Sequence, residues 1–434
     1  MKHVRISVLV PGMVTAEDVI GKGKKLILPK GLTLTDKAIM RLESYDIKAI
    51  RIEDPVGIEV EEVSDEELES ESLGVAPDEI DILAMIQGQL NGETEQETSG
   101  KQSKEEARIE EEVVAEEKTS AKSDEEQKPA SVNIEVNTFE EPSHHEKIQA
   151  SPKFKAFKKG FAKNVTELKG QLNDIVERNS PINVDAMLAP TMKLLSSEGD
   201  NTFGVFDMLH NMRQFDDLTY THSMNVALIC NVFAKWLGLS NEEAKLATAC
   251  GMLHDIGKLK IDDSIIKKPG KLTDAEYAKI KAHPVEGYKI LQHQNINEHI
   301  KNSALMHHEK CDGTGYPLKL TADKIDSYAK LVAIVDVYDA MTSARVYRGA
   351  LCPFTVIELF ENEGLHKYDI VYIMTFLENV INTYIDNRVL LSDGRVGVIK
   401  WIDKNNLSKP MVQLVDQSFV ELSKYKDLKI TKIL

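Results

Sequence analysis

Hydrophobic positions follow a helical period through the middle of the chain. In residues 222–239 (HSMNVALICNVFAKWLGL), the apolar side chains of Val226, Ile229, Phe233 and Leu237 recur on one helical face. Similar patterns run through residues 241–258, 273–292, 296–308, 327–347 and 353–362. These patterns predict a mainly α protein whose largest domain, at residues 203–386, is a helical bundle.

The two ends of the chain alternate between apolar and polar positions instead. Residues 1–53 contain the alternating runs VRISVLV and KKLILPKG, the helical run LTLTDKAIMRLESYDI and a last strand, KAIRIED, which together predict a small α+β domain. Residues 387–434 contain RVLLSDGRVGVIKWID, which turns at Asp393 and Gly394, and PMVQLVDQSFVELS. This part is predicted to be a small β-barrel-like domain.

A helical connector is predicted at residues 151–202. It begins with basic and aromatic residues at helical spacing (SPKFKAFKKGFAKNV), a pattern that could serve nucleic acid or a membrane. Packing of the aromatic face against other helices, with a solvated lysine face, is the interpretation that we favour. We therefore expect no nucleic-acid partner.

The net charge of −17 comes from one segment. Residues 53–147 hold 30 acidic and 7 basic residues, so the rest of the 434-residue chain is net positive. The stretch GETEQETSGKQSKEEARIEEEVVAEEKTSAKSDEEQKPA has too few apolar residues to offset the entropy lost on ordering. An acidic flexible linker is therefore predicted at residues 54–150.

The sequence also predicts a cytoplasmic location. No run of 18 apolar residues is present, and MKHVRISVLVPGM is too short and too broken to predict an export signal, so no membrane span is expected. The four cysteines form no CxxC pair, which is typical of reduced thiols. The sequence leaves open a homodimer, and a signalling partner that would bind the N-terminal domain or the acidic linker.

Imidazole and carboxylate side chains gather in the helical region, in or beside segments that could point toward one centre. There are seven of them: His222, His254, Asp255, His283, His307, His308 and Asp336. One metal ion with open positions rarely takes more than four or five protein ligands, so seven indicate two metal ions with Asp255 as the bridge. Two cations that share a hydroxide and hold a phosphate oxygen suit phosphoester hydrolysis.

The motifs around these residues resemble a known family. They are YTHSMNVA, HDIGKLKIDDSIIKKPGKLT, KAHPVEGYKIL, HHEKCDGTGYPLKL and AIVDVYDAMTSARVYRGAL, in order over about residues 203–380. This set resembles the HD-GYP family of bacterial cyclic di-GMP phosphodiesterases, a branch of the HD metal-dependent phosphohydrolases. LVPGMVTAEDV and LILPKGLTL also resemble a domain often found ahead of HD-GYP modules.

The resemblance implies an HD-type helical bundle in which the seven residues bind two divalent metal ions, iron or manganese. A third metal in some members uses a glutamate one turn before the first histidine. That place holds Leu218 here, so two metals are expected unless Asp217 takes part. Asp255 and Lys258 are implied as catalytic residues, with Lys258 on the helix face of His254, where it would aid proton transfer to the leaving oxygen or bind phosphate.

Substrate contacts are implied for the loop that contains Gly315, Tyr316 and Pro317, called the GYP loop below, and for the helix that carries Asp336. Tyr316 would stack on or flank a guanine, while Glu309 and Asp312 would orient the ligand histidines. The guanidinium groups suit phosphate and the guanine edge. The full expected set of substrate contacts is Gly315, Tyr316, Pro317, Asp339, Arg345 and Arg348.

The predicted function is hydrolysis of cyclic di-GMP to linear pGpG by a metal-bridging hydroxide at a binuclear centre, with GMP as a further product left open. Three alternatives remain: a receptor that binds cyclic di-GMP without turnover, a hydrolase of another cyclic dinucleotide such as cyclic GMP-AMP, and a di-iron oxygenase. The complete ligand set and Lys258 argue against the receptor, and the GYP loop and paired arginines argue against the oxygenase.

Overall fold

The computed structural model describes residues 2–53 with short gaps, 142–196, 202–212, 218–268, 270–343 and 350–434. In the N-terminal part, β1 (Lys2–Arg5) pairs antiparallel with β4 (Ala49–Ile52), and β2 (Val19–Ile20) pairs with β3 (Leu26–Leu28). Their apolar side chains close a core of their own. The helix predicted within residues 32–47 and the linker predicted at residues 54–150 lie largely outside the described residues.

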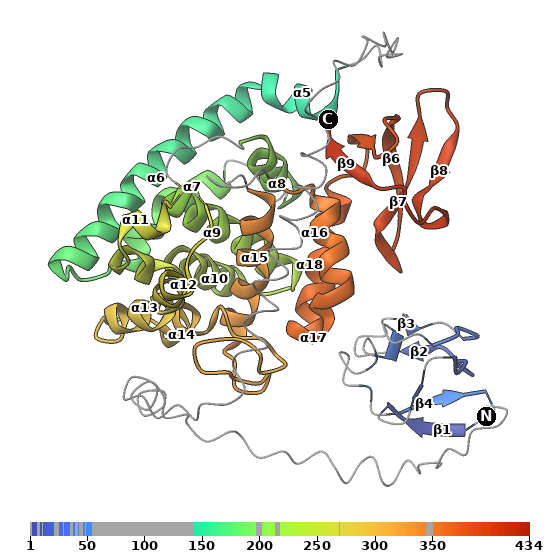
Figure 1. Ribbon diagram of the computed structural model, residues 1–434, viewed down its shortest axis with the longest axis horizontal. Helices are drawn as coiled ribbons and strands as arrows, with labels where there is room; N and C mark the ends of the chain where they lie inside the picture. The colour runs from blue at the N-terminus through green and yellow to red at the C-terminus, as the bar shows by residue number, and fades with distance from the viewer. Residues whose placement is uncertain are drawn as a thin grey trace. The chain divides into compact units, whose positions relative to one another are not determined.

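Helical structure resumes at α5 (His144–Ala150), within the range predicted for the linker. A capping box starts this helix: Ser143 Oγ accepts a hydrogen bond from the Glu146 amide, and the Glu146 carboxylate accepts one from the Ser143 amide. The long α6 (Pro152–Arg178) and α7 (Val184–Ser196) follow (Figure 1). Phe157 and Phe161 of α6 are buried, so its aromatic face packs against other helices as predicted.

The bundle itself is formed by helices that share one large hydrophobic core. Its elements are α8 (Thr202–Asn211), α9 (Leu218–Trp236), α10 (Asn241–Leu253), η3 (Ile256–Lys260), α11 (Asp263–Ile266), α12 (Asp274–Lys281), α13 (His283–Leu291), α14 (Glu298–Met306), α15 (Ser327–Thr342), α16 (Pro353–Leu359), η4 (Phe360–Gly364), α17 (Leu365–Lys367) and α18 (Ile370–Asn382). The predicted mainly α fold is thereby confirmed.

Two predicted helices are interrupted at residues that matter for the site. The helix predicted at 241–258 ends at Leu253, and residues 256–260 form the 3-10 helix η3. The helix predicted at 273–292 breaks at Ala282, because Pro284 has no amide hydrogen and suits the first turn of a new helix, α13. Both breaks place histidines at helix ends.

The C-terminal part is a five-stranded antiparallel sheet in the order β8-β7-β6-β5-β9. Its strands are β5 (Arg388–Leu391), β6 (Val396–Asp403), β7 (Asn406–Leu414), β8 (Phe419–Glu421) and β9 (Ile430–Ile433), with the short 3-10 helix η5 (Leu422–Lys424) after β8. The β5–β6 hairpin turns at Asp393 and Gly394 as predicted, with Gly394 at a φ of 86°. Glu361 ties this sheet to the helices, because its carboxylate accepts from the amides of Leu407 and Ser408.

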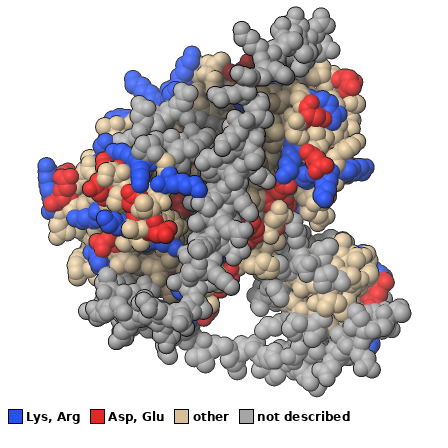
Figure 2. All heavy atoms as spheres, viewed as in Figure 1, with Lys and Arg blue, Asp and Glu red and all other residues tan. Residues whose placement is uncertain are grey.

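The surface of the described residues mixes both signs of charge. On the face shown in Figure 2, lysine and arginine side chains are interspersed with acidic ones over the helical region. Of the helices within the described ranges, none combines the length and apolar character needed to cross a bilayer.

Gly257 packs η3 directly against α13. A Cβ at this position would overlap the His283 carbonyl oxygen and lie 2.5 Å from the Gly287 amide nitrogen. Gly257→Ala is therefore expected to lower the free energy of unfolding by about 1–3 kcal/mol, the usual cost of overpacking. Chemical denaturation measures this directly.

The matched control is Gly170→Ala, at an exposed position of α6 where a Cβ would meet nothing within 4 Å. That change is expected to raise stability by about 0.5–1 kcal/mol, because alanine is the better helix former. Equal effects of the two substitutions would contradict the close packing of η3 on α13.

Candidate metal centre

The seven predicted ligands come together from the ends and faces of five helices. His254 and Asp255 directly follow α10, His307 and His308 directly follow α14, and His283 begins α13. The remaining two are His222 on α9 and Asp336 on α15. The structure thus brings together the complete set that the sequence singles out.

Asp255 lies between two groups of imidazoles. Its Oδ2 is 3.4 Å from His254 Nε2 and 3.7 Å from His222 Nε2. Its Oδ1 is 3.2 Å from His283 Nε2 and 3.6 Å from His307 Nε2. Each carboxylate oxygen therefore faces a different pair of histidines.

Asp336, on α15, faces the same first pair of histidines and also His308. Its Oδ1 is 2.9 Å from His222 Nε2 and 3.7 Å from His254 Nε2. Its Oδ2 is 3.9 Å from His308 Nδ1. Two buried carboxylates thus face both halves of one cluster, and carboxylates in such positions can bridge adjacent cations.

The outer nitrogens of three histidines are bonded to backbone carbonyls, which turns Nε2 inward. In each case the carbonyl belongs to a residue three or four positions earlier. The Nδ1–O distances are 2.7 Å from His254 to Gly251, 2.8 Å from His283 to Ile280, and 3.0 Å from His307 to Ser303.

His222 is oriented by Asp339 instead. The Asp339 carboxylate accepts from His222 Nδ1 at 2.7 Å, from Asn225 Nδ2 at 3.0 Å and from Ser343 Oγ at 3.2 Å. Asp339 is 4% exposed. The motif predicts a substrate contact for Asp339, whereas the structure places its carboxylate behind His222. Asn225 was missed there, although its spacing of three from His222 puts it on the same helix face.

Burial and charge set the protonation of the cluster. Burial alone would raise the pKa of Asp255, but the positive charges of His254 and Lys258 outweigh it and hold that pKa well below its usual value. Burial lowers the pKa of His307 to about 4, and it holds the pKa of His308 well below its usual value. Ionised carboxylates and neutral imidazoles are the forms that bind metal ions.

His254 behaves differently. Burial would lower its pKa, but the nearby negative charges of Asp255 and Asp336 outweigh burial and raise the pKa to about 10. A cation that binds this imidazole must therefore displace a proton.

Two buried polar atoms in the cluster make no hydrogen bond among the described residues: His254 Nε2 and Asp255 Oδ1. Leaving such atoms unsatisfied is costly, and a bound cation would remove the cost. The described residues offer three overlapping groups of three ligands whose atoms lie within 4.8 Å of one another. This donor set of nitrogen and carboxylate oxygen fits divalent metal ions.

Lys258 lies at the edge of the cluster. Its Nζ is 2.5 Å from Asp255 Oδ2, and its side chain is 21% exposed. The spacing of four predicts Lys258 on one α-helical face with His254, but residues 256–260 form the 3-10 helix η3 instead. The Lys258 ammonium group therefore contacts the Asp255 carboxylate and does not lie one α-helical turn above His254.

The GYP loop packs against the cluster through Tyr316. The Tyr316 and His308 rings are stacked with centroids 4.7 Å apart and an interplanar angle of 17°. Gly315 permits the close approach of the loop, because a Cβ there would lie 2.5 Å from Glu309 Cα. The expected contact between Tyr316 and a guanine stays a prediction.

Glu309 and Asp312 do not take the role predicted for them. Buried Glu309 accepts from the Leu318 amide at 2.6 Å and from the Leu320 amide at 2.9 Å, so it fixes the far end of the GYP loop. Exposed Asp312 accepts from the Thr314 amide at 3.0 Å within a turn. Their hydrogen bonds thus stabilise the loop rather than orient a ligand histidine.

Three of the predicted site residues lie outside the described residues. They are Arg345, Arg348 and Asp217. Leu218 begins α9, one turn before His222, and its aliphatic side chain cannot bind a metal ion. The sequence argument for two metals rather than three therefore stays a prediction.

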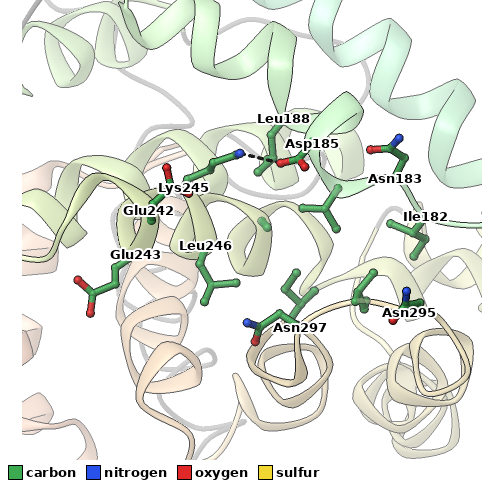
Figure 3. A pocket seen from close by; sticks show the side chains of 14 residues that line it. Ile182, Asn183, Asp185, Leu188, Glu242, Glu243, Lys245, Leu246, Asn295 and Asn297 are labelled. Carbon is green, nitrogen blue, oxygen red and sulfur yellow. Dashed lines mark ion pairs between the residues drawn. The ribbon is translucent and has the colours of Figure 1, made fainter.

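A groove of about 660 Å³ lies elsewhere on the bundle (Figure 3). It is lined at the starts of α7, α10 and α14, and the Asp185–Lys245 ion pair of 2.6 Å crosses its rim. His254 and His307 of the cluster follow the other ends of these two helices, α10 and α14. The 13 residues of α10 span about 20 Å, so the start of this helix, where the groove begins, lies that far from the end that His254 follows.

The helical region that carries the cluster is similar to a known protein family and to several known enzymes. A family model described as the HD domain matches residues 207–370. A cyclic di-GMP phosphodiesterase of Pseudomonas aeruginosa is 33% identical over 207 residues, which cover 48% of this chain and 50% of that protein. A 3′3′-cGAMP-specific phosphodiesterase of Vibrio cholerae is 39% identical over 145 residues, which cover 33% of this chain and 34% of that protein.

The chain thus spans half or less of the length of these relatives. Among solved structures, an HDG"Y"P protein from Bdellovibrio bacteriovorus aligns with 87% of this chain and 98% of its own, at 15% identity and a TM-score of 0.42. The resemblance predicted from the motifs is confirmed by the family model and the relatives. Residues 207–370 therefore match the HD domain family, and the motifs of this helical region resemble those of the HD-GYP branch.

Proposed function

We propose that this chain hydrolyses a 3′–5′ phosphodiester bond of cyclic di-GMP to give linear pGpG. The observation that carries the proposal is the pair of carboxylates, Asp255 and Asp336, each facing both halves of a cluster of five imidazoles. Two divalent metal ions fit this cluster, and iron or manganese suits its nitrogen and oxygen donors. When bound, two such ions supply Lewis acidity at the phosphate and a water of lowered pKa.

The residues of the chain divide the remaining work. Asp255 and Asp336 hold the two halves of the cluster at one separation, and Asp339 keeps His222 turned toward them. Lys258 is partly exposed beside Asp255, where its ammonium group can give a proton to the leaving 3′-oxygen. The Tyr316 ring, stacked on His308, forms a wall of the site that a guanine could contact.

Cyclic GMP-AMP remains a second candidate substrate, because three relatives are named for it. The Vibrio cholerae relative is a 3′3′-cGAMP-specific phosphodiesterase. Cyclic di-GMP and cyclic GMP-AMP share both phosphates and one guanine, so base contacts alone would separate them. We place the catalytic role in residues 203–386 and regard residues 1–53 and 387–434 as appended domains.

The direct test is anaerobic purification with Fe(II) or Mn(II), followed by separate incubation with each cyclic dinucleotide and chromatography of the products. The wild type is expected to release pGpG, and Asp255→Asn to lose at least about a hundred-fold in rate, because a bridging ligand is weakened. Asp263→Asn is the control, since it changes an exposed carboxylate of α11. Tight binding of cyclic di-GMP without product by the fully metallated wild type would identify a receptor instead.

Asp339→Asn tests the positioning of His222. Loss of the charged acceptor is expected to weaken metal binding by about 10–100-fold, as for other residues that orient a metal ligand. Titration of the metal-free protein with Mn(II) measures this affinity. Ser343→Ala is the control, because it removes another hydrogen bond to Asp339 and leaves the His222 contact. Unchanged affinity in Asp339→Asn would show that the hydrogen bond to Asp339 is dispensable for metal binding.

Lys258→Met tests the proton donor. Loss of a general acid is expected to lower kcat for cyclic di-GMP by about 10²–10⁴-fold. Bis(p-nitrophenyl) phosphate should be far less affected, because p-nitrophenolate leaves without a proton. Metal analysis of the variant is needed alongside, since Lys258 contacts Asp255. Equal losses on both substrates at full metal content would contradict this role.

A further inference from the structure

A lysine to which the sequence motifs assign no role lies at the rim of the metal centre. Lys281 is the last residue of α12 and precedes the ligand His283 by two positions. Its Nζ is 4.6 Å from the centroid of the Tyr316 ring and 5.2 Å from that of the Tyr277 ring. Tyr277 lies one turn earlier on the same helix. Two aromatic rings, one from the helix and one from the GYP loop, therefore attract the same ammonium group.

This contact joins Lys281 to the cluster through an unbroken series of side chains. Tyr316 contacts Lys281 and stacks on His308. The His308 ring in turn lies 5.0 Å from the His283 ring. Lys281 and Tyr316 are both partly exposed, so a ligand that enters the site from solvent can reach them. A positive charge is thus held at a set place beside the centre.

The substrate class creates a need for such a charge. A cyclic dinucleotide carries two phosphodiester anions, and the cluster with Lys258 can neutralise only the one that is cleaved. The other is one nucleotide away from it. A phosphate that leaves bulk water needs a cationic hydrogen-bond donor, and a lysine ammonium serves as one.

We infer that Lys281, held by Tyr277 and Tyr316, binds the second, uncleaved phosphate of the cyclic dinucleotide. The inference rests on the proposed function, because it assumes a substrate with two phosphates. It assigns the GYP loop a further task, which is to fix the position of a lysine as well as to pack against His308. A purely structural alternative is that Lys281 only fastens the loop to α12.

The experiment compares a substrate with two phosphates and a substrate with one. Lys281→Met removes the charge but keeps a flexible side chain that packs on aromatic rings. It is expected to raise KM for cyclic di-GMP by about ten-fold or more, with kcat little changed, because a charged hydrogen bond to the bound substrate is lost. The kcat/KM for bis(p-nitrophenyl) phosphate should stay within about two-fold of the wild type, since no uncleaved phosphate is present. Lys281→Arg should restore most of the KM.

The matched control is Lys279→Met, which removes an exposed charge from the same helix and should leave both substrates unaffected. Equal losses on both substrates in Lys281→Met would show a structural clamp and overturn the inference. An unchanged KM for cyclic di-GMP would overturn it as well, while leaving the proposed function in place. A wild type that cleaves bis(p-nitrophenyl) phosphate but no cyclic dinucleotide would remove the proposed function and this inference with it.

Discussion

The cost of burying unsatisfied polar groups in one cluster is the constraint around which the helical region is arranged. Three of the five imidazoles and both carboxylates are buried, and His254 Nε2 and Asp255 Oδ1 are left without hydrogen bonds among the described residues. Such a collection is costly unless cations bind it. The bundle therefore gives up stability at one place in order to present a preorganised set of metal ligands.

Helix ends are what make this set possible. A residue that follows the last turn of a helix can direct its side chain over the end of that helix. The last carbonyls of the helix have no amide partners within it, so they can accept a hydrogen bond from this side chain. His254 and His307 use both properties: each follows a helix and donates its outer nitrogen to a carbonyl of the turn before. Gly257 and Pro284 serve the same arrangement, because one lets η3 touch α13 and the other starts α13 beside its ligand histidine.

The sequence was sufficient to predict most helices and to single out the side chains that the structure brings into one cluster, since the apolar period is strong and these side chains stand in recognisable motifs. It was insufficient where partners are distant or where the helix type changes. Glu309 bonds to amides nine and eleven residues later, and no local pattern reveals that. Asp339 was assigned to the substrate because its burial behind His222 depends on the packing of α15 on α9. The break at Ala282 could have been predicted, because His283 precedes a proline.

The central claim is that Asp255 and Asp336 hold two cations close enough to share ligands. The most direct measurement is electron paramagnetic resonance of the protein loaded with Mn(II), together with metal analysis of the same sample. Two ions per chain with a spectrum of exchange-coupled Mn(II) would agree with carboxylates that face both halves of the cluster. One ion per chain, or two ions with the spectra of isolated Mn(II), would contradict it.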